Sequence, residues 1–369
     1  MGNRYPEWTY SAALAALPLQ TPLRLRRLIA LDTPSHVWDM LQAGERPLVG
    51  VNDAVWRAWH KADASLLIST AEACIDSSMT VVSMRDAPYP PSLLGDPSAP
   101  GVLFMIGDAG AFHNRRVGII GTRHATQRGK YFAQLLGKQL SAAGVSVVSG
   151  LARGIDVESH VGALSLSAKD GCPPIAIVAS GLDMVYPPEH ERIWGEIGRR
   201  GLLISESPPG TPPEPHRFPM RNRIIAGLAD AVVVIESNKN GGSLITAELG
   251  NDYNREVFAF PGPIHQAQSE GCHTLIKNQQ AHLLTSAQDL LQTMNWTNVH
   301  QETSLRQQQA YSGLQKEILD HFKNKNNWSI DELALRTKNA VSQISSTLFE
   351  LELNGALQNI GANRYRLPL

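Results

Sequence analysis

The sequence has few cysteines, no long apolar segment and no excess of charge of either sign. Its three cysteines, Cys74, Cys172 and Cys272, are far apart and lack Cys-x-x-Cys spacing, which argues against a disulfide framework or a zinc ribbon and favours a reducing cytosol. No apolar run approaches the length of a membrane span, and the first ten residues lack the apolar core of a secretory signal. We therefore expect a cytoplasmic protein without membrane contact.

The charge balance limits how this chain could bind a polyanion. With a formal net charge of −1, no global field attracts nucleic acid, so any positive charge that does so must be concentrated in one cleft. The 369 residues exceed one average domain, and two or three domains are expected.

The sequence changes character twice. Residues 10–83 are rich in Ala and Leu with a helical pattern broken by prolines, which predicts a small bundle of short helices. Residues 295–312 are polar and Gln-rich, as is typical of a linker, and three amphipathic segments and an alternating hairpin follow. We expect a helical domain at 1–84, a central domain at 85–300, and a linker with a winged-helix domain at 301–369.

The central region alternates short apolar runs with helical segments. Buried runs separated by helices indicate parallel βαβ units and an α/β fold. Ligands bind outside the carboxyl ends of the strands in such sheets, and glycine-bearing turns follow the runs at those ends. The expected strands are 117–120, 145–149, 175–180, 202–205, 231–236 and 256–260.

The segment from Phe218 to Glu248 contains the most informative pattern. Arg221 and Arg223 open a helical stretch, and a Gly-Gly-Ser turn that ends at Ser243 begins the next helix. The N–H groups at a helix start are free and the helix dipole adds positive potential. Arginines beside such a turn favour a phosphate site. The alternative is an ordinary helix start with two surface arginines.

The first strand–turn–helix, VGIIGTRHATQRGK, matches no standard nucleotide motif. Gly118 and Gly121 lack the dinucleotide spacing, and the Gly-Lys-Ser/Thr ending of a P-loop is missing. The turn instead carries Thr122, Arg123 and Thr126, whose guanidinium and hydroxyls could hold a phosphate without a metal. Turn chemistry alone is the alternative.

The second turn, SGLARGID, places Arg153 between two glycines and Asp156 where it is expected to cap the next helix. Asp156 and His160 lie one helical turn apart. Because no third ligand accompanies them, we favour a structural hydrogen bond over a metal or nucleophile site. We predict no catalytic residue, no metal and no cofactor.

Phe218 lies directly before the arginines of the FPMRNR segment. An aromatic ring beside a phosphate site is the pairing needed to stack an unpaired base. Packing of this ring in the core is an equal alternative.

Together, these segments resemble the DNA-processing protein A family (DprA, also called Smf). The resemblance covers residues 89–284 in ordered blocks: YPPSLL with PGVLF, VGIIGTRHAT, VVSGLARGIDVESHVGAL, ASGLDMVYPPEH, LISESPPGTPP, FPMRNRIIAGLAD, GGSLITAE and REVFAFPGPI. It implies a Rossmann-like core with an N-terminal SAM-like or helix-hairpin-helix domain. It also implies a non-enzymatic homodimer that binds and protects incoming single-stranded DNA and loads the RecA recombinase during natural transformation.

The family's DNA pocket carries over to matching positions. The resemblance implies DNA contact by Arg123, Phe218, Arg221, Arg223, Gly242 and Ser243, with Lys239 as a neighbour and Thr122, Thr126 and Arg153 on the adjoining turns. The sequence departs from the family at Gly241, where many members have serine, and at Gln280, where glycine is common. The N-terminal segment LPLQTPLRL lacks the hairpin glycines, so DNA contact by residues 1–83 is not expected.

Phosphoribohydrolases of the LOG, or lysine-decarboxylase-like, family are the main alternative, because they share a related core and a PGGxGTxxE loop. Gly241, Gly242 and Glu248 match that spacing, but Thr246 is displaced by one and no proline precedes the glycines. Glu248 would be the general acid/base of such an enzyme. A scaffold that only recruits partners is a third alternative.

The last predicted helix, AVSQISSTLFELELNG, carries Glu350 and Glu352 and no Lys or Arg. A winged helix that reads DNA needs basic or amide side chains on the exposed face of this helix. We therefore expect the C-terminal module to mediate protein contacts or to tune assembly.

Overall fold

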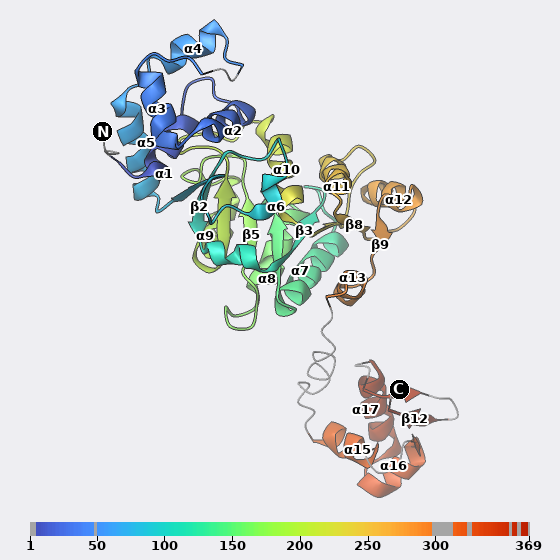
Figure 1. Ribbon diagram of the computed structural model, residues 1–369. Helices are drawn as coiled ribbons and strands as arrows, with labels where there is room; N and C mark the ends of the chain where they lie inside the picture. Colours follow the sequence, from blue (N-terminus) through green and yellow to red (C-terminus); the bar gives the residue numbers. More distant parts are fainter. Residues whose placement is uncertain are drawn as a thin grey trace. The chain divides into compact units, whose positions relative to one another are not determined.

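The computed structural model describes residues 5–47, 50–296, 313–322, 327–353, 356–359 and 363–367. The chain forms two compact units, residues 1–290 and 291–369. Figure 1 shows the elements of each unit along the chain.

A nine-stranded sheet forms the centre of the first unit, with strand order β1-β2-β6-β5-β4-β3-β7-β8-β9. In this order, all strands from β6 through β3 to β9 are mutually parallel. In contrast, β2 pairs antiparallel with both β1 and β6. The strands are β1 Thr80–Ser83, β2 Val102–Gly107, β3 Arg115–Ile120, β4 Val145–Ser149, β5 Ile175–Ile177, β6 Leu202–Ser205, β7 Ala231–Val234, β8 Glu256–Ala259 and β9 His282–Leu283. All six strands expected from the apolar runs are present, and β1, β2 and β9 were not expected.

The path of the chain through the sheet creates a switch point. From β3 the chain moves outward through β4 and β5 to β6, and it then returns to β7, which lies on the other side of β3. The register pairs Val117 with Ala231 and Ile120 with Val234, so the carboxyl ends of β3 and β7 lie level. Ligands of open parallel sheets bind where the strand order reverses in this way.

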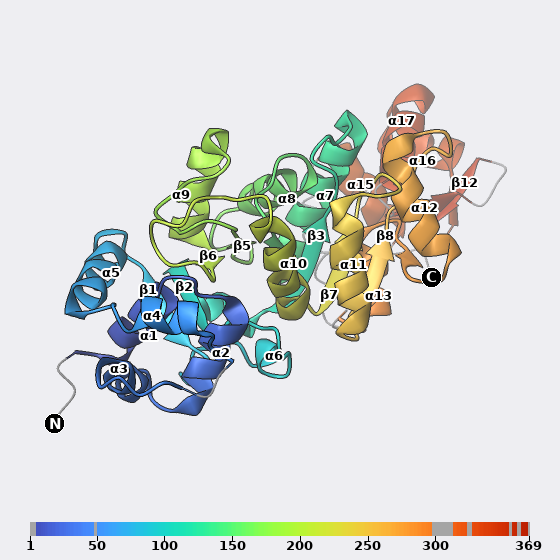
Figure 2. The same ribbon diagram turned by 90° about the horizontal axis from the view of Figure 1, so that it is seen from above.

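Helices cover both faces of this sheet (Figure 2). The helices of the first unit are α1 Glu7–Ala15, α2 Pro22–Leu31, α3 Pro34–Gln42, α4 Asp53–Trp59, α5 Ala64–Asp76, α6 Pro91–Leu94, α7 Gln127–Ala142, α8 Ile155–Leu164, α9 Glu191–Arg200, α10 Arg217–Leu228, α11 Gly242–Asp252 and α12 Glu270–Lys277, and α13 Ala287–Thr293 follows. Side chains alternate between the faces of a strand, and β2 shows this directly. Phe104 packs on the face that carries α8 and α9, while Leu103 and Met105 pack on the face that carries α10 and α11.

Two of the prolines that interrupt the N-terminal region, Pro22 and Pro34, mark helix starts. Thr21 and Thr33 accept hydrogen bonds from the first turns of α2 and α3, and each helix begins with a proline, whose missing N–H costs nothing there. The expected bundle of short helices is therefore confirmed. Its core is continuous with the face of the sheet that α8 and α9 cover, so these helices and the sheet share one compact unit.

The second unit is a winged-helix module. Its elements are α15 Leu314–Phe322, β10 Asn327–Ser329, α16 Ile330–Thr337, α17 Val341–Leu353, β11 Gln358–Asn359 and β12 Arg364–Arg366. β12 pairs antiparallel with both β10 and β11. The three helices and the hairpin were expected, whereas β10 was not. Ser329 caps α16 by accepting from the Glu332 N–H, and the Glu332 carboxylate accepts from the Ser329 N–H.

We expect Ser329→Ala to lower the stability of α16 by about 1 kcal/mol, because one N–H of the first turn loses its acceptor. Hydrogen exchange of the 330–337 amides in the full chain measures this. Ser346→Ala, on the exposed face of α17, is the control and should leave those amides unchanged. Equal protection of the α16 amides in both variants would contradict the capping role.

Candidate nucleic-acid interface

A cleft of about 550 Å³ opens at the switch point between β3 and β7. Its walls come from the loop after β3, from the first half of α10 and from the loop that leads into α11. These three segments lie far apart in the sequence and meet because the carboxyl ends of β3 and β7 are level. The cleft thus occupies the position that the sheet topology favours for a ligand.

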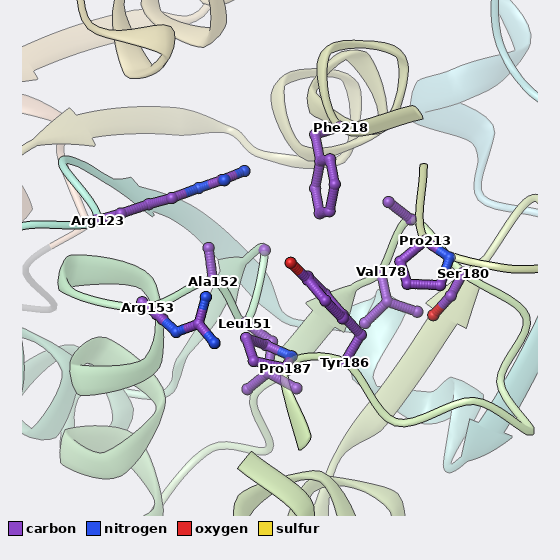
Figure 3. Close-up of a pocket in the computed structure, with 12 residues that line it drawn as sticks. Arg123, Leu151, Ala152, Arg153, Val178, Ser180, Tyr186, Pro187, Pro213 and Phe218 are labelled. Atoms are coloured by element: carbon purple, nitrogen blue, oxygen red, sulfur yellow. The ribbon is translucent and has the colours of Figure 1, made fainter. Parts of the chain in front are cut away.

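A cation and two aromatic rings form one end of this cleft. The guanidinium carbon of Arg123 lies 4.8 Å from the centre of the Phe218 ring, within the range of a cation–π contact. The Tyr186 and Phe218 rings are 5.7 Å apart between centres and tilted by 49°. In Figure 3, Arg123 extends toward Phe218, and Tyr186 lies in the same pocket. This end of the cleft therefore offers a positive charge beside apolar ring surface.

The start of α11 forms the other end. Gly241 precedes the helix, no side chain caps this terminus, and Gly241, Gly242 and Ser243 line the cleft. The first N–H groups of a helix have no partner within the helix and carry partial positive charge. An anionic oxygen at this end would therefore meet uncapped backbone donors.

Arg221 lies beneath the cleft rather than on its surface. Its side chain is buried, with only 4% of the residue exposed, and Nη1 donates to the Gly150 carbonyl at 2.5 Å and to the Ile177 carbonyl. Nε has no partner among the described residues. Arg221 therefore ties α10 to the ends of β4 and β5, and it still lines the cleft.

The turn after β4 is built around this guanidinium. A Cβ atom at Gly150 would overlap the Arg221 guanidinium, so the close approach requires glycine. Leu151 is buried with φ of 54°, a backbone conformation that is strained for a residue with a side chain. Its carbonyl bonds to Nδ1 of His190 at 3.0 Å.

Asp156 does not cap α8, because the helix begins at Ile155 after Gly154. The prediction of a capping role is therefore wrong. Its carboxylate instead accepts from the Gly150 N–H at 3.1 Å. Burial raises the pKa of Asp156 to about 6, and the nearby charge of Arg221 opposes this shift.

The expected hydrogen bond between Asp156 and His160 is also absent. Burial lowers the pKa of His160 to about 3, so the ring is neutral. Neither ring nitrogen makes a hydrogen bond of ordinary geometry to a described residue, although the Ser149 backbone is near enough to oppose the shift. The two residues thus belong to the packed support of the turn.

The remaining candidate residues lie around the cleft in different roles. Thr122 lines it. Thr126 caps α7 and donates to the Glu236 carboxylate at 2.6 Å. Arg153 lines the adjoining pocket and pairs with Glu189 at 2.5 Å.

Arg223 and Lys239 lie in opposite environments, one buried and the other exposed. Arg223 is buried in an ion pair with Glu206 and is not part of the cleft wall formed by the described residues. Burial raises the pKa of Glu206, and the Arg223 charge opposes this shift. Lys239 is exposed on the loop between β7 and α11, next to Asn238, which lines the cleft.

Two features of the cleft were not among the candidate residues. Tyr186 comes from the YPP segment, where the aromatic residue before two prolines could contact a ligand but the sequence favoured burial. Asn222 lies one helical turn after Phe218 and shares its face of α10. Periodicity from Phe218 would have found this residue.

The described part of the chain holds no cluster of three or more potential metal ligands. Within the same residues, no helix has the length and apolar character needed to cross a bilayer. Glu248, the acid/base residue of the phosphoribohydrolase alternative, is exposed on α11 and lies outside the set of described residues that line the cleft.

The sheet order, the cleft at the reversal point and the C-terminal module define a Rossmann-like α/β protein with an appended winged helix. Comparison with known protein families shows which family the chain belongs to. The DNA recombination-mediator protein A family matches residues 80–295, and the DprA winged helix domain matches residues 302–361. The chain belongs to this family, also known as DprA or Smf.

Individual relatives agree with this membership. The chain is 35% identical over 286 residues to protein Smf of Escherichia coli, which covers 76% of this chain and 75% of that protein. It superposes on the X-ray structure of DprA from Streptococcus pneumoniae with a TM-score of 0.65 and 31% identity, over 78% of this chain and 98% of that one. A DNA processing protein A from Helicobacter pylori, whose structure describes single-stranded DNA binding, matches with a TM-score of 0.52 and 27% identity, over 59% of this chain and 97% of that one.

We expect Gly150→Ala to lower the free energy of unfolding by about 3 kcal/mol, because the added methyl group displaces a buried guanidinium from its two carbonyl acceptors. Gly195→Ala is the matched control, since a Cβ on this exposed glycine of α9 meets nothing within 4 Å. It should raise stability by about 0.5–1 kcal/mol. Urea unfolding of the full chain measures both, and an unchanged or raised midpoint for Gly150→Ala would contradict the role assigned to Arg221.

Proposed function

We propose that this protein binds single-stranded DNA in the switch-point cleft and acts without catalysing a reaction. The observation that carries the proposal is the arrangement of Arg123 over Phe218, across the cleft from the uncapped start of α11. The Helicobacter pylori relative supports it, because its structure concerns single-stranded DNA binding.

The two ends of the cleft suit different parts of a nucleotide. Backbone donors and a guanidinium bind phosphate oxygens, while the Phe218 and Tyr186 rings offer stacking surface to an unpaired base. Bases in a duplex are already paired and stacked, so the aromatic surface favours a single strand. Phosphate contacts and stacking carry little base information, and binding should tolerate any sequence.

The candidate arginines contribute in different ways under this proposal. Arg123 is exposed and can meet a phosphate directly, whereas the Arg221 guanidinium already serves two carbonyls and adds its charge from below the cleft. Arg223 is committed to Glu206. Arg153 would have to leave Glu189 to contact DNA.

Protection of incoming DNA, loading of RecA and homodimer formation stay predictions from the family resemblance. They fit a protein that holds a single strand without altering it. The described residues of the cleft offer no nucleophile–base pair, so we expect no release of base from AMP, and Glu248→Gln should change no such activity.

Arg123→Ala should weaken binding of a labelled single strand, because a phosphate loses its cation, and should lower the slope of log K against log salt by about 1. Phe218→Ala should cost about 1–3 kcal/mol if the ring stacks on a base. Fluorescence anisotropy at two salt concentrations measures both.

Arg192→Ala is the matched control for Arg123→Ala, because Arg192 has an 80% exposed side chain on α9, outside the cleft. It should leave affinity unchanged. Wild-type affinity and salt slope in both cleft variants would place the DNA site elsewhere.

The C-terminal module has an exposed α17 face that lacks cations within its described residues: Ser342, Gln343, Ser345, Ser346 and Glu350. Arg364 of the hairpin pairs with Glu332 at 3.2 Å. The Glu350 carboxylate, which is exposed on this face of α17, would repel DNA phosphates. We therefore propose that the module contacts protein rather than DNA.

Removal of residues 305–369 should leave single-strand affinity within about twofold of the full chain, because the proposed phosphate contacts all lie before this segment. Duplex affinity, measured in parallel, should stay equally weak. A selective loss of duplex binding would show instead that α17 reads DNA.

A further inference from the structure

A second cleft, of about 490 Å³, lies on the opposite side of the first turns of α10. One wall comes from residues 15–25, which end α1 and begin α2, and the other from the loop between β6 and α10. Both walls belong to the first compact unit. The helical N-terminal region thus closes a compartment directly beside the switch-point cleft.

Helix α10 separates the two clefts and contributes a different face to each. Phe218 and Asn222, one turn apart, line the switch-point cleft, while Arg217 and Met220 line the second. Arg221 lines both. Its buried guanidinium is therefore a positive charge common to the two compartments, and its Nε has no partner among the described residues.

The second cleft has the mixed character that a nucleotide requires. Leu17 and Leu25 line the cleft but are buried, so the partly exposed Met220 provides the apolar surface inside it for the face of a base. Leu19 adds to it from the rim, where it is 61% exposed with φ of 57°. An exposed leucine in a left-handed conformation is costly, and this one holds apolar surface open to solvent at the cleft.

Charged groups of both signs border this apolar surface. Arg217 and His216 line the cleft next to Glu214, which lies 3.0 Å from Arg217 Nε and 3.6 Å from His216 Nε2. Glu206 also lines it, but this carboxylate is paired with Arg223. A phosphate at the rim must therefore compete with Glu214 for Arg217. Removal of Arg217 and removal of the Glu214 charge should thus change DNA affinity in opposite directions.

We propose that the second cleft binds the nucleotides that continue from the switch-point cleft, so that a single strand passes around the first turn of α10. This inference rests on the proposed function of the switch-point cleft. It also revises the expectation that residues 1–83 take no part in DNA contact, because they form one wall. The chemical class of ligand is a sequence-independent single-stranded oligonucleotide.

The test is the affinity of the full chain for labelled oligothymidylates of increasing length, from about 4 to 20 nucleotides. A short oligomer fills only the switch-point cleft, whereas a long one also reaches the second. Arg217→Ala should weaken long oligomers by about fivefold and leave short ones unchanged, because only the long strand places a phosphate at the rim. Glu214→Gln should strengthen long oligomers by about twofold, since the competing carboxylate is removed.

A pair of variants at Leu19 controls for changes in folding. Asp and Asn have similar shapes and both tolerate positive φ, so Leu19→Asp and Leu19→Asn differ mainly in charge. Leu19→Asp should bind long oligomers less tightly than Leu19→Asn, with equal affinity for short ones. Equal length dependence in wild type and in all four variants would overturn the second cleft alone. Failure of the wild type to bind any length would overturn the proposed function and this inference together.

Discussion

The buried guanidinium of Arg221 is the contact on which the candidate site depends. It joins α10 to the ends of β4 and β5 through two backbone carbonyls, and Asp156 holds the same turn through the Gly150 N–H. A buried charge is tolerated only where its hydrogen bonds are largely met. Because α10 also carries Phe218, this internal contact fixes the position of the aromatic surface relative to Arg123.

The sheet topology explains how a chain with a net charge of −1 can present an anion site. Loops that follow β3 and β7 converge where the strand order reverses and supply one exposed guanidinium and an uncapped helix start, and Phe218 of α10 and Tyr186 of the segment after β5 add two rings to the same cleft. Under the proposed function, affinity for DNA would depend on the local geometry of the clefts beside α10 rather than on a general basic surface.

The repeated pattern of apolar run, glycine turn and helix was sufficient to predict the parallel core. Strands that are buried on both faces read as continuous apolar runs, and all six such runs form strands. The strands β1 and β9 were missed because they are short edge elements, and both residues of β9 are exposed. β2 was not predicted from the sequence, because it follows a proline-rich connector and pairs antiparallel with β6.

The sequence located the region of the site better than the role of each residue. Arg221 and Arg223 are basic residues at the start of a helix, which is equally compatible with surface and buried positions. Only tertiary contacts reveal that one binds two carbonyls and the other Glu206. Thr126 likewise caps α7 and bonds to Glu236, a residue 110 positions away. Roles that depend on such distant partners could not be derived from local spacing.

Photocrosslinking of a single strand to the full protein tests the central claim most directly. An oligothymidylate that carries 5-bromouracil would be irradiated in complex with the chain, and the modified peptides would be mapped by mass spectrometry. The account predicts crosslinks at Tyr186, at Phe218 and in the loop that leads to Ser243. Crosslinks confined to the C-terminal unit, or to the opposite edge of the sheet, would contradict it.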